Sequence, residues 1–279
     1  MQRIVIIPNP VKDAELSVTL KLIAKLSDLG MTAYISRCYG NISDRVSFYD
    51  EFPSDAELIV VVGGDGSVID ASRAAVEHDI PIVGVNLGRV GYLSEVDPGA
   101  LDLFDRLVDG SFGVKEKMLL SICSDGGEDQ VYAVNDVTVS RGGYLGIAEF
   151  NLSDSCGNSL GYRADGVVFA TPQGSTAYSF SSGGPVVAHD VEGILVTPIC
   201  PHSFFNRSVI FNSSETLSVT NNGTYPMNIM VDGRKHKELG PNEVCRIRCA
   251  DRRIKMLVFS ENSMFTELFK KMNVTEGLK

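Results

Sequence analysis

The chain has 279 residues and a hydrophobic fraction of 44%, which is enough for two domains or for one large one. Its formal net charge of -10 gives a surface that repels nucleic acids and anionic membranes, so we expect neither as a partner. No apolar run reaches the roughly 18 residues of a transmembrane helix, and the N-terminal segment is typical of a first strand rather than a signal peptide. We therefore expect a cytoplasmic protein.

The first third of the chain alternates between strand and helix patterns, which predicts an α/β layer fold. The expected strands are residues 3–10, 32–37, 56–62 and 80–86, and the expected helices are residues 15–30, 67–79 and 98–110. The third strand, with the sequence AELIVVV, alternates too little to be half exposed. It should be buried on both faces, as the strands of parallel sheets are.

After residue 112 the pattern changes to short apolar runs separated by Gly, Asn, Asp and Ser, which predicts a β-rich, sandwich-like domain. Residues 261–273 have apolar side chains at helical spacing, and we expect this helix to return to the first domain. The predicted organisation is a Rossmann-like α/β domain over 1–112, a β-rich domain over 113–255 and a C-terminal segment, 256–279, that packs back on the first domain.

Cysteine and histidine give no sign of a metal site. The six cysteines are scattered without CxxC spacing, so we expect buried, reduced thiols and assign no metal ligand to the protein. The four histidines lack metal-ligand spacing as well. No hydrolase signature is present either, because GSTAY is not GxSxG.

The sequence GGDGS, residues 63–67, follows the buried strand and precedes a helix. Its glycines allow a ligand to approach the backbone, and the helix that follows offers unpaired N–H groups and a positive dipole end to an anion. The stretch matches neither the Walker pattern nor GxGxxG, so Asp65 needs another explanation. Its carboxylate can accept a hydrogen bond from a hydroxyl and take its proton, hold a magnesium ion through water, or cap the helix.

The sequence NLGRVGYL, residues 86–93, forms a second glycine-containing turn after the next buried strand. In an open α/β sheet, ligands bind at the carboxyl ends of the strands. Because both turns follow strands of one sheet, we expect them to lie side by side.

Asn135 and Asp136 interrupt an apolar strand. Adjacent strand residues face opposite ways, so both reach one ligand only if a bulge or a turn intervenes. The amide of Asn135 is suited to a base edge, because it both donates and accepts, and Asp136 is suited to accepting from ribose hydroxyls. The alternative is that the pair forms an ordinary hairpin turn.

Residues 162–187 are the least ordinary stretch of the chain, because glycines and small hydroxyl residues crowd around one tyrosine. After Asp165 the stretch contains no Asp, Glu, Lys or Arg, although a surface loop would carry charges. This composition indicates close backbone contact with a ligand, with hydroxyls from Thr176, Tyr178 and Ser181. Tyr178 is equally compatible with a packing role.

Taken in this order, these stretches resemble the NAD kinase family. The motifs that carry the resemblance are GGDGS, NLGRVGYL, Asn135-Asp136, ADGVVFATPQGSTAYSFSSGGP, TPICPHS and VDG at 231–233, and they cover roughly residues 57–235. GGDG alone also occurs in diacylglycerol-type lipid kinases and phosphofructokinases. The Gly/Ser/Thr block together with TPICPHS is highly specific.

The resemblance implies an enzyme that phosphorylates the 2′-hydroxyl of the adenosine ribose of NAD with ATP and a divalent metal ion, magnesium being the expected one, to give NADP. It implies that Asp65 faces this hydroxyl as the catalytic residue, and that Arg163 and Asp165 lie toward the other end of the dinucleotide. The residues implied for binding NAD or nucleotide phosphates are Gly64, Gly66, Tyr92, Asn135, Asp136, Arg163, Asp165, Thr176, Ala177, Tyr178 and Ser181. Similar family members are homodimers or homotetramers.

Three positions depart from the commoner residues of the family. Ser67 replaces threonine, Asp136 stands where glutamate is common, and Gln173 stands where a small hydroxyl residue is usual. The amide of Gln173 either adjusts the adenine pocket or turns outward.

Two other functions fit parts of the sequence. A GGDG-type lipid kinase would need an apolar pocket for acyl chains, which the polar 162–187 stretch does not favour. A non-catalytic NAD(P) sensor would bind the dinucleotide without turnover.

Overall fold

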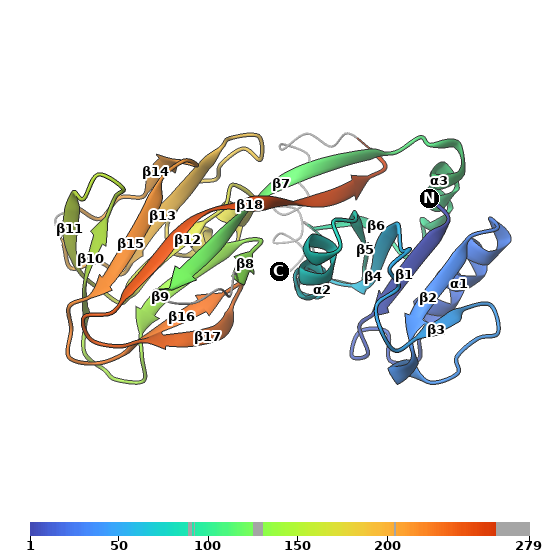
Figure 1. Cartoon of the computed structure of the whole chain (residues 1–279), viewed down its shortest axis with the longest axis horizontal. Helices are drawn as coiled ribbons and strands as arrows, with labels where there is room; N and C mark the ends of the chain where they lie inside the picture. Colours follow the sequence, from blue (N-terminus) through green and yellow to red (C-terminus); the bar gives the residue numbers. More distant parts are fainter. Residues whose placement is uncertain (89–90, 92, 125–130, 204, 261–279) are drawn as a thin grey trace, which may run out of the picture. The chain divides into compact units, whose positions relative to one another are not determined.

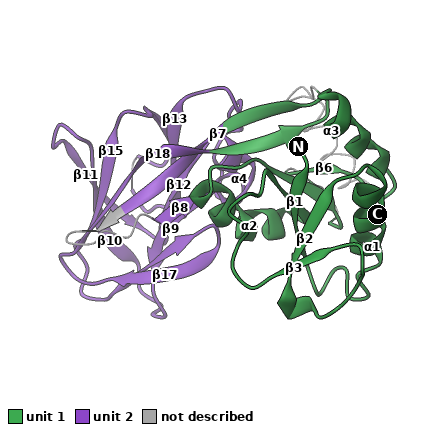
Figure 2. Ribbon diagram, turned by 45° about the vertical axis from the view of Figure 1, so that its right-hand side comes forward, with its two compact units in different colours: residues 1–116, 254–279 green, residues 117–253 purple. Residues whose placement is uncertain are grey.

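The structure is a computed structural model that describes residues 1–88, 91, 93–124, 131–203 and 205–260 (Figure 1). It divides into two compact units (Figure 2). Unit 1 holds residues 1–116 and 254–260 of the described chain, and unit 2 holds residues 117–253. The predicted helix over 261–273 lies outside the described residues. Among the described helices, none combines the length and the apolar character that a membrane span needs.

Unit 1 is built on a parallel sheet. Its strands are β1 (Arg3–Pro8), β2 (Thr32–Ser36), β3 (Ser47–Tyr49), β4 (Leu58–Gly63), β5 (Ile82–Asn86) and β6 (Ser94–Val96). They lie in the order β3-β2-β1-β4-β5-β6, each parallel to its neighbour. Every residue of β4 is buried, which confirms the prediction made from its continuous apolar run.

Helices cover both faces of this sheet. The helical segments are α1 (Ser17–Asp28), η1 (Arg37–Tyr39), α2 (Asp65–Glu77), η2 (Leu101–Asp105) and α3 (Arg106–Asp109). Val60 and Val62 of β4 share a core with Leu22 of α1. On the other face, Val68 of α2 packs so closely on Gly84 that a side chain there would crowd it. The α/β class is therefore confirmed.

The predicted helix over 98–110 is shorter and tighter than expected. It starts only at Leu101 and runs as a 3-10 segment before the single α-turn of α3. The Ala100 that precedes it offers no side-chain cap. Gly110, at φ 76°, ends the segment in the left-handed conformation that glycine adopts most readily.

Unit 2 is a β-sandwich, which confirms the β-rich prediction. Its strands are β7 (Gly113–Ser124), which enters from unit 1, β8 (Val131–Ala133), β9 (Asp136–Arg141), β10 (Ala148–Ser153), β11 (Ser159–Ala164), β12 (Gly166–Ala170), β13 (Gly193–Ile199), β14 (Val209–Asn212), β15 (Thr216–Asn221), β16 (Met227–Val231), β17 (Arg234–Leu239) and β18 (Val244–Val258). One sheet has the order β14-β13-β12-β9-β16-β17, and the other contains β11-β10-β15-β18 with β7 and β8. Phe150 and Val219 of the second sheet meet Val137 and Phe169 of the first in one core.

The expectation of buried thiols is wrong for three cysteines. Cys38, Cys156 and Cys200 are exposed, whereas Cys245 is buried. The exposed ones occupy η1, the turn between β10 and β11, and the residue directly after β13. Such connecting segments run over the surface, and their side chains stay accessible.

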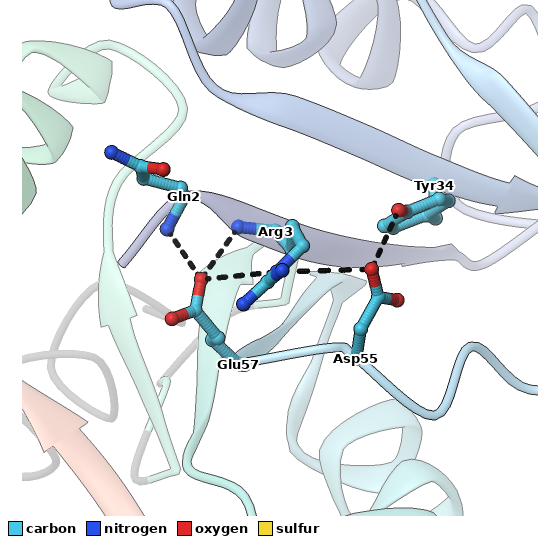
Figure 3. Close-up of polar contacts among 5 residues, drawn as sticks. All are labelled: Gln2, Arg3, Tyr34, Asp55 and Glu57. Carbon is cyan, nitrogen blue, oxygen red and sulfur yellow. Dashed lines mark hydrogen bonds and ion pairs between the residues drawn. The ribbon is translucent and has the colours of Figure 1, made fainter.

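Polar contacts tie the amino ends of β1 and β4 together (Figure 3). The Glu57 carboxylate accepts hydrogen bonds from the backbone N–H groups of Gln2 and Arg3, at 2.7 and 3.0 Å. The Asp55 carboxylate accepts from the Tyr34 hydroxyl at 3.3 Å and lies 3.8 Å from the Arg3 guanidinium. This network lies at the end of the sheet opposite to the glycine turns.

The chain returns to unit 1 through the end of β18, where Met256 pairs in parallel with Ile82 of β5. Phe259 then packs edge-on against Phe104, with ring centroids 5.5 Å apart. The Glu95 carboxylate accepts from the backbone N–H of Phe259 at 3.1 Å. The returning segment is thus part of the unit 1 core.

Replacing Phe104 with alanine should destabilise the protein strongly, because this side chain is fully buried in the unit 1 core. We expect the free energy of unfolding, measured by urea denaturation, to fall by about 3–5 kcal/mol. Phe205, which is 42% exposed, provides the matched control. Phe205→Ala should change the value by less than about 0.5 kcal/mol. Equal effects of the two substitutions would contradict the assignment of the core.

Candidate active site

The GGDGS stretch forms the junction between β4 and α2. Gly63 is the last residue of β4, Gly64 is the N-cap of α2, and Asp65 is the first helical residue. A side chain at Gly63 would collide with Ser67 in the first turn of the helix. The junction therefore requires a glycine where the strand turns into the helix.

The second glycine turn lies beside the first, as predicted. Gly63 is the parallel partner of Asn86, and the Leu87 N–H donates to the Gly63 carbonyl at 2.6 Å. A Cβ atom built on Gly64 would lie 3.6 Å from the Cα of Gly88. The two turns thus meet through their backbones at the carboxyl ends of β4 and β5.

The hypothesis that Asp65 caps α2 is wrong, because the N-cap is Gly64 and no side chain makes the capping hydrogen bond. The Asp65 carboxylate instead accepts from the Leu93 N–H at 3.0 Å and from the Ser94 hydroxyl at 3.5 Å. It is half-buried in the first turn of the helix, where the helix dipole favours a negative charge. The strand–turn segment around β6 therefore orients this carboxylate.

The loop after β1 contributes two residues that the sequence analysis did not single out. The Asn9 side chain accepts from the N–H groups of Val11 and Lys12, at 2.9 and 3.0 Å. The same side chain donates to the Ser67 hydroxyl at 2.7 Å and so ties the loop to the first turn of α2. The Asn-Pro dipeptide after the first strand was the available sequence signal, since it marks a structured turn.

Lys12 extends over both glycine turns. Its ammonium nitrogen occupies the place that a side chain of Gly64 would fill, and it lies 3.5 Å from a Cβ atom built on Gly88. No carboxylate of the described residues pairs with this ammonium group. A cation thus rests on the backbone of the glycine turns, although the GGDGS motif itself contains no lysine.

In unit 2, the Asn135-Asp136 pair interrupts the strand pattern where the chain crosses from the sheet that contains β8 to the sheet that contains β9. β8 ends at Ala133 and β9 begins at Asp136, so a turn separates the two strands. The Asp232 carboxylate accepts hydrogen bonds from the N–H groups of Val134, Asn135 and Asp136, at 2.8, 2.7 and 3.1 Å. Asp232 was within the VDG motif, but its contact across the fold was not predicted.

The Gly/Ser/Thr block packs on this interruption. The Thr171 hydroxyl donates to the Val134 carbonyl at 2.7 Å, and the Thr171 N–H donates to the Asn135 carbonyl at 2.9 Å. A side chain on Gly174 would overlap the Asn135 carbonyl. The Tyr178 N–H donates to the Asp136 carboxylate. Three sequence motifs therefore meet here, because the pairing of β12 with β9 aligns Ala170 with Asp136.

Asp136 is 5% exposed, and its burial raises its pKa from 3.8 to about 6. The negative charge of Asp232 acts in the same direction. Hydrogen bonds from the Thr138 hydroxyl and the Tyr178 N–H oppose the shift in pKa, because they stabilise the ionised form. Such a perturbed carboxyl is typical of a functional site.

Four of the predicted adenosine-binding residues lie in or between η3 (Gln173–Thr176) and α4 (Tyr178–Ser181). Thr176 and Ala177 are half-buried and Ser181 is exposed. Tyr178 is 46% exposed, so it does not pack in a core. Gln173 is 7% exposed, which excludes the alternative that its amide turns outward to solvent.

Arg163 and Asp165 lie beside the TPICPHS motif but are engaged in ion pairs. The Arg163 guanidinium lies 3.2 Å from Glu149, and the Asp165 carboxylate lies 3.1 Å from Arg141. The His202 N–H donates to the Arg163 carbonyl at 2.7 Å. The Arg163–Glu149 pair is largely exposed and the Arg141–Asp165 pair is partly exposed, so a competing ligand can open both at low cost. Tyr92 lies outside the described residues.

Among the described residues, no three or more His, Cys, Asp or Glu side chains lie together in a way that could hold a metal ion. Asp65 is the carboxylate at the glycine turns. Magnesium is commonly held by one or two carboxylates together with substrate phosphates rather than by a complete protein cage. This donor set fits a metal ion that enters with a nucleotide.

Two family models match the chain. The model described as the ATP-NAD kinase N-terminal domain matches residues 4–112, and the ATP-NAD kinase C-terminal domain matches residues 134–259. The NAD kinase of Lachnoclostridium phytofermentans is 33% identical over 95% of this chain and 96% of its own length. That of Acetivibrio thermocellus is 34% identical over 96% of each chain.

Two solved structures share the fold. Yeast NADH kinase complexed with NADH has a TM-score of 0.84 and 22% identity, over 98% of this chain and 88% of that one. An NAD kinase from Archaeoglobus fulgidus in complex with ATP has a TM-score of 0.72 and 23% identity, over 98% and 99% of the two chains. With both family models and relatives of near-equal length in agreement, the chain belongs to the NAD kinase family and is an enzyme that phosphorylates NAD.

Proposed function

We propose that the chain transfers the γ-phosphoryl group of ATP to the 2′-hydroxyl of the adenosine ribose of NAD, with a divalent metal ion, and so produces NADP. The observation that carries this proposal is the setting of Asp65. Its carboxylate is held by the Leu93 N–H beside two glycine turns, at the sheet edge where α/β folds bind ligands. The architecture thus supports a phosphate site and a hydroxyl acceptor site next to each other.

Asp65 is proposed as the catalytic residue. Its carboxylate accepts the hydrogen bond of the 2′-hydroxyl and takes the proton as the new O–P bond forms. The bond from the γ-phosphorus to the bridging oxygen breaks, and ADP leaves with that oxygen. Phosphoryl transfer depends mainly on positioning and charge stabilisation. The hydrogen bonds from Leu93 and Ser94 provide this positioning for the carboxylate.

The donor phosphates are proposed to bind on the backbone of Gly64 and Gly66, at the N-terminus of α2. Lys12 supplies the positive charge of this site, because its ammonium group already rests on Gly64 and Gly88. The divalent ion, expected to be magnesium, would be held by the ATP phosphates and by Asp65. It would neutralise charge that develops on the transferred group.

The NAD side of the proposal rests on unit 2. Asn135 would contact the adenine edge, and ionised Asp136 would accept from a ribose hydroxyl. The proposed lining of the adenosine part comprises Tyr92, Thr176, Ala177, Tyr178 and Ser181. Arg163 and Asp165 would contact the far end of the dinucleotide after their present ion pairs open. The contacts between the Gly/Ser/Thr block and the Asn135-Asp136 turn support this assignment.

We assign the proposed roles to three consecutive segments of the chain. Residues 1–112 serve the donor and the catalytic carboxylate, residues 113–255 serve NAD, and residues 256–279 complete the first domain. The resemblance to the family supports a homodimer or homotetramer. Neither a lipid kinase nor a non-catalytic sensor is favoured by the relatives that match the chain.

Replacement of Asp65 by asparagine tests the catalytic role. The amide oxygen can still accept from the Leu93 N–H, so the variant should fold and bind NAD. The loss of the proton acceptor should lower kcat for NADP formation with ATP and magnesium by about 100-fold to 10,000-fold. Asp70→Asn, on the exposed side of the same helix, is the matched control and should keep its rate. A wild-type rate in Asp65→Asn would overturn the assignment.

Replacement of Lys12 by methionine tests the donor site. Methionine keeps most of the side-chain length but removes the charge, so KM for ATP should rise by about tenfold to a hundredfold. KM for NAD should change much less. Lys21→Met removes an exposed lysine of α1 and serves as the control. Equal KM values for ATP in the two variants would show that Lys12 does not bind the donor phosphates.

A further inference from the structure

Asp232 links two turns that lie far apart in the sequence. Its carboxylate accepts from three consecutive backbone N–H groups, which stand 96 to 98 positions earlier in the chain. In return, the Asp232 N–H donates to the Asp136 carbonyl at 2.9 Å. Hydrogen bonds to an ionised acceptor are stronger than neutral ones. This contact therefore fixes the backbone of Asn135 and Asp136.

The hairpin turn between β16 and β17 accounts for the presence of Asp232 only in part. Asp232 and Gly233 form the two-residue turn between β16 and β17, with φ values of 47° and 77°. Asp-Gly is a favoured sequence for such a hairpin turn, and Asn-Gly serves equally well. The turn alone therefore does not require a carboxylate. The three hydrogen bonds across the fold do use both of its oxygens.

The same carboxylate acts electrostatically on Asp136. From the β16–β17 turn, the negative charge of Asp232 faces the Asp136 side chain and adds to the effect of burial on its pKa, which is about 6. From β9, the Thr138 hydroxyl lies 3.4 Å from the Asp136 carboxylate, and from α4 the Tyr178 N–H donates to it. Asp232 is thus the charged group whose removal would make Asp136 easier to ionise.

We propose that Asp232 is a positioning residue of the NAD site, which holds Asn135 and Asp136 in place for NAD and makes NAD binding weaken in mildly acidic solution. The inference rests on the proposed contact between ionised Asp136 and a ribose hydroxyl. Protonation of Asp136 removes a charged acceptor, so NAD affinity falls as the pH is lowered through the pKa of this group. Without the charge of Asp232, that pKa is lower and the fall in affinity moves to lower pH.

The raised pKa of Asp136 also makes the free energy of unfolding depend on pH. The folded state holds the Asp136 proton more tightly than the unfolded state, because the folded pKa is about 6 and the unfolded value is 3.8. The stabilisation is complete below the unfolded pKa and is lost as the pH rises through the folded pKa. Asp232→Asn should reduce this part of the pH dependence of the free energy of unfolding.

Calorimetric titration of the full-length protein with NAD, without ATP, tests the inference over a pH range that brackets 6. Asp232→Asn should weaken NAD binding at neutral pH by about tenfold and shift the midpoint of the pH dependence to lower pH. The matched control is Asp154→Asn, because Asp154 also accepts two backbone N–H bonds in a hairpin turn of unit 2. The control should match the wild type. Wild-type affinity and an unshifted midpoint in Asp232→Asn would overturn the role of Asp232.

Asp136→Asn separates this inference from the proposed function. If it leaves NAD affinity unchanged, the proposed contact of Asp136 with NAD is wrong, and the inference falls with it. If it weakens binding and abolishes the pH dependence while Asp232→Asn has no effect, the inference alone fails. Carbon-13 NMR of the carboxyl groups measures the pKa of Asp136 in the wild-type protein, so this test does not depend on the folding of a variant. An Asp136 titration near its ordinary value, 3.8, would contradict the proposed electrostatic effect.

Discussion

The interruption between β8 and β9 depends on acceptors for its backbone N–H groups. A strand that leaves its ladder must place these donors elsewhere, since a buried unpaired donor costs about 1–3 kcal/mol. The Asp232 carboxylate accepts all three of them from the β16–β17 turn. The chain can therefore cross from β8 in one sheet to β9 in the other without leaving these N–H groups unpaired. The candidate NAD site of unit 2 is built around this crossing.

The other side of the interruption is fixed by the segment that follows β12. Thr171 bonds to the carbonyls of Val134 and Asn135, and the backbone of Gly174 packs directly on Asn135. Only glycine allows this approach. Because contacts hold the turn from two sides, its polar side chains are presented in fixed directions. Such preorganisation lowers the entropy that a ligand must remove on binding.

The sequence predicted those features that follow from local rules. The continuous apolar run before GGDGS indicated a buried parallel strand, and the rule for carboxyl strand ends placed the two glycine turns together. The contacts of Lys12 with Gly64 and of Asp232 with Asn135 could not be predicted in this way. Each joins segments that are distant in sequence, and each depends on the exact course of a loop, for which periodicity carries no information.

The position of the Lys12 ammonium group helps to explain why a glycine turn can contain a carboxylate. A phosphate site benefits from a cation, whereas a hydroxyl that is to be phosphorylated benefits from a base. If the lysine followed the glycines directly, as in a Walker loop, it would compete to pair with a neighbouring acid. Here the ammonium group comes from the loop after β1, and the Leu93 N–H orients the Asp65 carboxylate. Opposite charges can therefore serve different groups at one sheet edge.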